Sequence, residues 1–240
     1  MKCLGLIGNL NDSLVGVYTQ TINAEVQKEL GGNHSADVRF CCIDAAKVDE
    51  LLAGEDWDSI AALLVDCGRS LILAGADGLV ICGSKLNPVA FEVREILKVP
   101  LIDMAYAVET VLRNHGHRRV GIVSPSTSRE EKWWCDDLSR ISMLHPSGLE
   151  CEWLNARGAD AVAGHNIEKH WIIDTRQILV GLRCRKADAV VLSSPIFNRL
   201  IIADECPLDF YDASEIHAWA AALWALNPGP QSASNCVFAG

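Results

Sequence analysis

A cysteine at the end of an apolar run is the residue with the clearest capacity for chemistry in this chain. Cys82 follows the apolar residues 79–81 and precedes Gly83, Ser84 and Lys85. Backbone N–H groups at a turn that opens a helix can stabilise an anion, either a substrate carboxylate or the thiolate itself. Lys85 adds a positive charge. The segment predicts a reactive cysteine with three binding residues after it, and the alternative is a buried thiol without chemistry.

A second segment repeats this pattern later in the chain. Residues 184–194 follow the order of residues 74–82: a helix end, an Ala-Asp turn, an apolar strand and a small nucleophilic residue. The repeat predicts that Ser194, beside Ser193, occupies the place that Cys82 has in the first segment. Ligands bind at the carboxyl ends of strands in open α/β sheets. We therefore expect two lobes of similar design with a ligand cleft between them.

Short apolar runs alternate with longer stretches of helical spacing, which is typical of parallel sheets covered by helices. Strands are predicted over residues 2–7, 37–43, 78–82, 101–103, 120–123, 149–154, 189–192 and 208–211. Helices are predicted over residues 15–30, 57–74, 88–97, 105–114, 129–143, 169–184 and 214–226. The fold class is α/β, with a parallel four-stranded sheet flanked by helices in each lobe. The predicted lobes are 1–104 plus 209–240, and 105–208.

Composition excludes several classes of protein. The 240 residues are 50% hydrophobic and carry a net charge of −10, which argues against nucleic acid and anionic membranes as partners. No apolar run approaches the roughly 18 residues that cross a bilayer, so a cytoplasmic location is predicted. The ten cysteines form no CxxC motif, and we expect reduced thiols and no metal. The histidine-containing residues 114–119 are interpreted as an exposed turn.

Motifs spread over nearly the whole chain occur in the order of a known family. They lie at residues 2–8, at Tyr18, and at residues 22–23, 31–36, 75–77, 80–82, 99–102, 119–121, 212 and 216–218. Together they resemble the aspartate racemase branch of the aspartate/glutamate racemase superfamily. The resemblance implies two α/β lobes related by a pseudo-twofold axis, no cofactor, and a homodimer. It also implies a two-base mechanism, in which one cysteine removes the α-proton of a small amino acid and a second cysteine returns one.

The chain departs from that pattern at both cysteine positions. Gly83 and Ser84 stand where the family has Asn-Thr, and Ser194 stands where the family has the cysteine of a Gly-Cys-Thr-Glu motif. A serine hydroxyl is far less acidic than a thiol. Three functions stay open: an asymmetric amino-acid racemase or epimerase using Cys82, a single-cysteine decarboxylase or isomerase, and an inactive carboxylate-binding protein.

Neutral hydrogen-bond donors for a substrate carboxylate are predicted in two loops. Asn11 and Ser13 lie in the opening loop, and Ser126 and Thr127 follow the predicted strand 120–123. The alternative for the second loop is an ordinary polar turn that caps the next helix.

A cation is required for a distal carboxylate of an aspartate- or glutamate-like substrate. Lys169 is a weak match to the family, Arg199 and Lys47 are alternatives, and each is otherwise a solvated surface charge. His217 has the Asp-x-x-x-x-His relation of the family to Asp212 and is predicted to bind substrate. Its alternative is a structural histidine hydrogen-bonded to that carboxylate.

Overall fold

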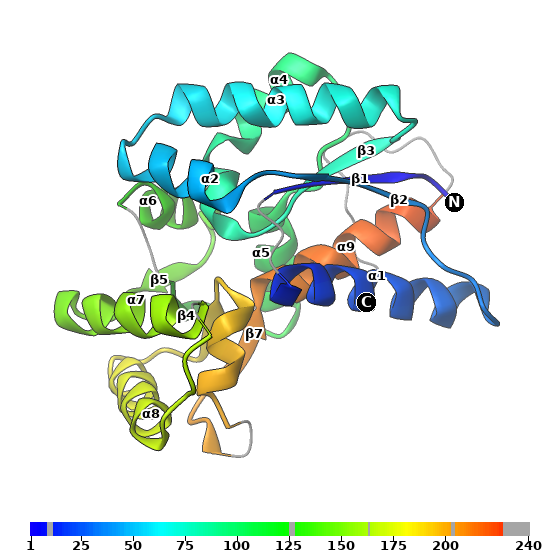
Figure 1. Cartoon of the computed structure of the whole chain (residues 1–240). Helices are drawn as coiled ribbons and strands as arrows, with labels where there is room; N and C mark the ends of the chain where they lie inside the picture. Colours follow the sequence, from blue (N-terminus) through cyan, green and yellow to red (C-terminus); the bar gives the residue numbers. More distant parts are fainter. Residues whose placement is uncertain (9–11, 125–127, 163, 203–204, 228–240) are drawn as a thin grey trace. The chain divides into compact units, whose positions relative to one another are not determined.

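Helices and parallel strands alternate along the chain in the computed structural model (Figure 1). The structure describes residues 1–8, 12–124, 128–162, 164–202 and 205–227. Its elements are β1 (Leu4–Gly8), α1 (Asp12–Leu30), β2 (Val38–Cys42), α2 (Ala45–Ala53), α3 (Trp57–Leu73), β3 (Gly78–Ile81), the 3-10 helix η1 (Ser84–Val89), α4 (Ala90–Leu97), α5 (Met104–Asn114), β4 (Arg119–Val123), α6 (Ser128–Asp137), β5 (Ser142–Leu144), α7 (Gly148–Val162), α8 (Lys169–Cys184), β6 (Ala189–Leu192), the 3-10 helix η2 (Pro195–Leu200), β7 (Asp209–Asp212) and α9 (Ala213–Leu226).

The chain divides into two compact units. Unit 1 consists of Met1–Ala107 and the C-terminal segment from His217, and unit 2 is Val108–Ile216. Residues 209–216 were expected in the first lobe. The structure places them in unit 2, because β7 is hydrogen-bonded to β6 in the second sheet.

Unit 1 is built on a parallel sheet with the strand order β2-β1-β3. Helices α2, α3 and α4 cover one face and α1 and α9 cover the other (Figure 1), so that β1 and β3 are buried along their whole length. The predicted strand 101–103 forms one bridge, from Leu101 to Leu79, before the chain turns into α5. Among the described residues this sheet therefore has three strands, and the prediction of a fourth is wrong.

The start of β3 packs tightly against α9. A Cβ atom on Gly78 would lie 2.4 Å from Trp224 Cη2 and 2.8 Å from Trp224 Cζ3. The rigid indole ring cannot bend away from it. We expect Gly78→Ala to lower the free energy of unfolding by about 1 to 3 kcal/mol through overpacking. Urea denaturation measures this loss. Gly16→Ala is the control, because nothing lies within 4 Å of a Cβ at Gly16, and equal stability of the two variants would contradict the packing.

Unit 2 is built on a parallel sheet with the order β5-β4-β6-β7. The predicted strand 149–154 is wrong, since these residues lie in α7, and the edge strand is β5. The helix starts there because Ser147 and Glu150 form a capping box. The Ser147 N–H donates to Glu150 Oε2 at 2.6 Å, and the Glu150 N–H donates to Ser147 Oγ at 3.4 Å. The predicted helix 129–143 is too long. The observed helix α6 ends at Asp137, and β5 follows it.

Candidate active site

Cys82 lies at the carboxyl end of β3, inside unit 1. Its backbone N–H donates to the Ile7 carbonyl oxygen at 2.8 Å, which continues the β1–β3 ladder past the strand. The Cys82 side chain is 1% exposed. Gly8 ends the neighbouring strand with a φ of +155°, and a Cβ on it would lie 3.1 Å from the Cys82 carbonyl oxygen. The glycine therefore allows the two strand ends to approach.

The pKa of Cys82 is set by its burial. Desolvation raises the pKa of this thiol well above its ordinary value, a backbone hydrogen bond from Ile7 opposes this, and the thiol of Cys42 adds to it. The expectation that the turn and Lys85 stabilise a thiolate is therefore wrong. The Lys85 side chain is exposed, and the helix that begins after Gly83 is a 3-10 helix of only six residues. Cys82 is a thiol at neutral pH.

The turn after Cys82 is held by Asn87, which the sequence analysis did not identify. Gly83 has a φ of +81°, a conformation that favours glycine. Asn87 Nδ2 donates to the Ile81 oxygen at 2.9 Å and to the Gly83 oxygen at 2.7 Å. Asn87 and Ser84 are buried. The side-chain amide thus joins the end of β3 to the start of η1 and fixes the turn that carries Cys82.

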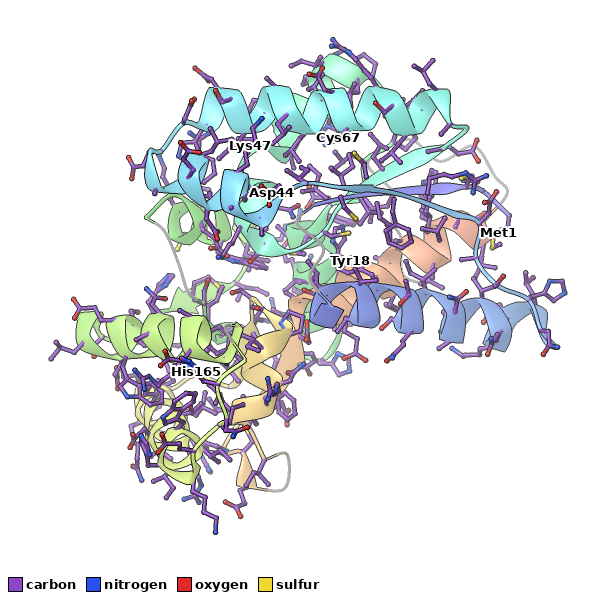
Figure 2. All side chains as sticks on the ribbon, in the orientation of Figure 1. Met1, Tyr18, Asp44, Lys47, Cys67 and His165 are labelled. Atoms are coloured by element: carbon purple, nitrogen blue, oxygen red, sulfur yellow. The ribbon has the colours of Figure 1, made fainter. Side chains whose placement is uncertain are left out.

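A buried chain of hydrogen bonds links this turn to α1 and α9. Gly83 N–H donates to the Tyr18 hydroxyl oxygen at 3.4 Å, and this hydroxyl lies 2.8 Å from His217 Nδ1. His217 Nε2 lies 2.9 Å from the Ile102 carbonyl oxygen. Figure 2 shows Tyr18 between α1 and the sheet. Tyr18 is one of the family-motif residues, but no role was predicted for it.

His217 is fully buried and both ring nitrogens have protein partners. Neither nitrogen is therefore open to a ligand, which contradicts its prediction as a substrate-binding residue. The alternative, a hydrogen bond to Asp212, is also wrong in detail. Asp212 instead accepts from Ser214 N–H at 2.7 Å, at the start of α9, and from Asn198 Nδ2 at 2.6 Å. Burial raises the pKa of the Asp212 carboxyl despite these bonds.

His217 makes the stability of the protein depend on pH. Burial lowers its pKa from 6.5 to about 4, although the Ile102 carbonyl and Asp103 act in the opposite direction. Between these values the unfolded chain binds a proton that the folded chain does not. The free energy of unfolding should therefore fall by about 1.4 kcal/mol per pH unit as the pH drops from 6.5 toward 4, and this contribution should be constant above 6.5.

Urea unfolding between pH 7 and pH 4.5 measures this slope. His217→Gln should reduce the slope, whereas His115→Gln, at an exposed histidine, should leave it unchanged. Identical slopes in both variants would show that His217 does not carry the effect.

The carboxyl end of β6 carries two serines in unit 2. Ser193 N–H donates to the Val123 oxygen at 3.0 Å, in the same way that Cys82 N–H donates to Ile7. Ser194 is the residue before η2, as Gly83 is the residue before η1. The strand register therefore makes Ser193, and not Ser194, the equivalent of Cys82. Ser193 is buried and Ser194 is half-buried.

Residues 16–221 of the chain match the family model of the Asp/Glu/Hydantoin racemases. The chain belongs to this family. A Yersinia pestis protein assigned to the Asp/Glu racemases is 25% identical, with a TM-score of 0.86 over 95% of this chain and 100% of its own. An aspartate racemase homologue from Pyrococcus horikoshii OT3 is 20% identical, with a TM-score of 0.78 over the same shares.

An arylmalonate decarboxylase variant has a similar fold. In that double variant a glycine is replaced by cysteine and a cysteine by serine. It is 16% identical to this chain, with a TM-score of 0.54 over 96% of this chain and 95% of its own. The resemblance to the racemase superfamily and the α/β class predicted from the sequence are both confirmed.

The other predicted racemase-site residues divide between the two units. Gly83, Ser84 and Lys85 share the Cys82 turn in unit 1, where Ser13 lies in the first turn of α1. Lys169 is the exposed first residue of α8 in unit 2. The remaining residues fall into two groups: the alternative cations Lys47 and Arg199 are exposed, and Asn11, Ser126 and Thr127 lie outside the described residues.

No metal centre is found in the described part of this racemase-family chain, where no three His, Cys, Asp or Glu side chains are grouped to hold an ion. The expected exposed turn at residues 114–119 needs correction. His117 is buried, and its Nε2 lies 2.9 Å from the Tyr211 hydroxyl. His117 is therefore a buried histidine hydrogen-bonded to β7. None of the helices in the described ranges is both long and apolar enough to span a membrane.

Proposed function

We propose that this protein is a cofactor-independent amino-acid racemase or epimerase that moves the α-proton of a small carboxylate-bearing amino acid through Cys82. The observation that carries the proposal is the single cysteine on a buried, rigid turn at the carboxyl end of β3, in a chain of the Asp/Glu/Hydantoin racemase family. Open α/β sheets bind their ligands at this edge.

The raised pKa of Cys82 defines its part in the reaction. At neutral pH the group is a thiol, so it can give a proton to a carbanion. When the thiol instead loses its proton to solvent, the thiolate that remains is a strong base in a dry site. It then takes the α-proton: the C–H bond breaks, an S–H bond forms, and the electron pair moves from the α-carbon into the substrate carboxylate. Hydrogen-bond donors at that carboxylate stabilise the charge.

Ser194, or a water that it holds, transfers the proton on the face of the substrate opposite Cys82. This makes the reaction asymmetric. An alcohol is a poor acid compared with a thiol. Return of a proton by Cys82 on the same face gives isotope exchange without inversion. Return from the other side gives racemisation, and we expect this second route to be slower.

One observation favours a second function, a decarboxylase with one acidic cysteine. Such an enzyme needs only a thiol that protonates an enediolate from one face, and burial keeps Cys82 in its thiol form. The arylmalonate decarboxylase variant with an introduced cysteine has a similar fold. The third possibility is an inactive protein that binds carboxylates. The homodimer and the cytoplasmic location stay predictions.

Proton NMR in heavy water tests these functions. The enzyme is incubated with L- and D-amino acids, centred on aspartate and glutamate, and separately with monosubstituted malonates. Loss of the α-proton signal with inversion supports the racemase, and loss without inversion supports one-base exchange. Release of carbon dioxide from a malonate supports the decarboxylase. Binding of amino acids without exchange, detected by ligand saturation transfer, contradicts the racemase. When no malonate releases carbon dioxide either, this result supports the inactive protein.

A further inference from the structure

Tyr18 connects the turn after Cys82 to a histidine 199 residues further along the chain. The Ile102 carbonyl can only accept a hydrogen bond, so His217 Nε2 must carry a proton toward it. With its pKa lowered to about 4, His217 is neutral at pH 7, and its Nδ1 is therefore an acceptor. The Tyr18 hydroxyl consequently donates its proton to Nδ1.

This proton arrangement decides what Tyr18 offers to the turn. Because the hydroxyl proton points at His217, a lone pair of the oxygen faces Gly83 N–H, 3.4 Å away. Each donor in the series of hydrogen bonds that runs from the Ile102 carbonyl through His217 and Tyr18 to Gly83 then faces an acceptor. His217 also packs edge-on against the Tyr18 ring, with 5.8 Å between centroids, which restricts the position of the hydroxyl.

Asn87 and Tyr18 act on opposite groups of the same turn. Asn87 binds the Ile81 and Gly83 carbonyl oxygens, so that its contacts lie within the segment from β3 to η1. Tyr18 binds the Gly83 N–H and is anchored on α1, with His217 on α9 behind it. The peptide between Cys82 and Gly83 is thus tied to the helices that cover this face of the sheet (Figure 1).

We propose that Tyr18 is a positioning residue for Cys82: its hydroxyl, oriented by His217, holds the Gly83 N–H and fixes the direction in which the Cys82 Sγ meets the substrate. The expected effect on the rate of α-proton exchange rests on the proposed function. Removing the oxygen alone keeps the ring packing but frees the turn, and a small displacement of a reacting group can cost up to about 100-fold in rate.

The first test compares Tyr18→Phe with Tyr106→Phe, a control at an exposed tyrosine. We expect Tyr18→Phe to lower kcat for α-proton exchange about 10- to 100-fold and to change KM less than about threefold, because the loss concerns alignment and not binding. Tyr106→Phe should match the parent protein. A Tyr18→Phe variant with the kcat of Tyr106→Phe overturns the proposal.

Variants at His217 separate positioning from simple packing. Glutamine can donate to the Ile102 carbonyl and accept from the Tyr18 hydroxyl, whereas leucine can do neither. His217→Gln should therefore keep kcat within about threefold of the parent, and His217→Leu should lower it about as much as Tyr18→Phe. Equal losses in both His217 variants would contradict an orienting role for the hydrogen bond.

Two measurements do not depend on turnover. Imidazole ¹⁵N shifts of the parent protein should show His217 neutral with the proton on Nε2, and the Gly83 amide should be protected from hydrogen exchange. The opposite tautomer or an unprotected amide overturns the geometry even where no variant folds. If no substrate exchanges, the proposed function fails. Iodoacetamide alkylation of Cys82 then still tests Tyr18, since Tyr18→Phe must change its rate relative to Tyr106→Phe.

Discussion

Cys82→Ala is expected to reduce α-proton exchange about 100- to 10,000-fold, the range supplied by a positioned acid or base. Exchange should also rise with pH to well above pH 9 in the parent protein, because burial raises the pKa of the thiol and the thiolate is the base. Proton NMR in heavy water measures both effects. Among the described residues no other cysteine lies at the end of β3 or β6, and Cys42, whose thiol influences the pKa of Cys82, lies at the end of β2.

Cys184→Ala is the matched control for this result. Cys184 is an exposed thiol at the last residue of α8, far in sequence from the β3 turn, and its loss should leave the exchange rate unchanged. Exchange that persists in the Cys82→Ala variant would remove the cysteine from the mechanism. In that case the base would be a group other than Cys82.

Ser194→Cys is expected to increase the rate of inversion about 10-fold or more, because a thiol with a pKa of about 8.5 is a much better proton donor than an alcohol. Inversion is measured by chiral chromatography of the product, and exchange by NMR on the same sample. The ratio of inversion to exchange should rise, since the Cys82 side of the reaction is unchanged. This ratio separates a new acid from a general gain in activity.

Ser193→Cys is the control that makes the result specific. The family motif aligns the second cysteine with Ser194, whereas the strand register makes Ser193 the equivalent of Cys82. Because successive residues of an extended chain point in opposite directions, only one of the two thiols can face the substrate. A gain in Ser193→Cys and not in Ser194→Cys would transfer the second role to Ser193. No gain in either variant would sink the two-sided mechanism.

Local patterns were sufficient for most of the fold. Residues 79–81 and 190–192 are continuous apolar runs because strands covered on both faces have no polar side, and both were correctly predicted as strands. Residues 149–154 were wrongly predicted as a strand, because apolar residues alternate with Glu150 and Glu152 there, and so short an alternation does not exclude a helix. The capping box of Ser147 and Glu150 was the local signal for the helix.

The sequence by itself determined the α/β class, the family, and the place of Cys82 at the end of a buried strand, because each depends on residue types at short spacing. Only the tertiary structure decided the ionisation of Cys82 and the role of His217. Both depend on desolvation by residues distant in the chain, which no local pattern records. The partner of His217 proved to be Tyr18, 199 residues away, because α1 and α9 cover the same face of the first sheet.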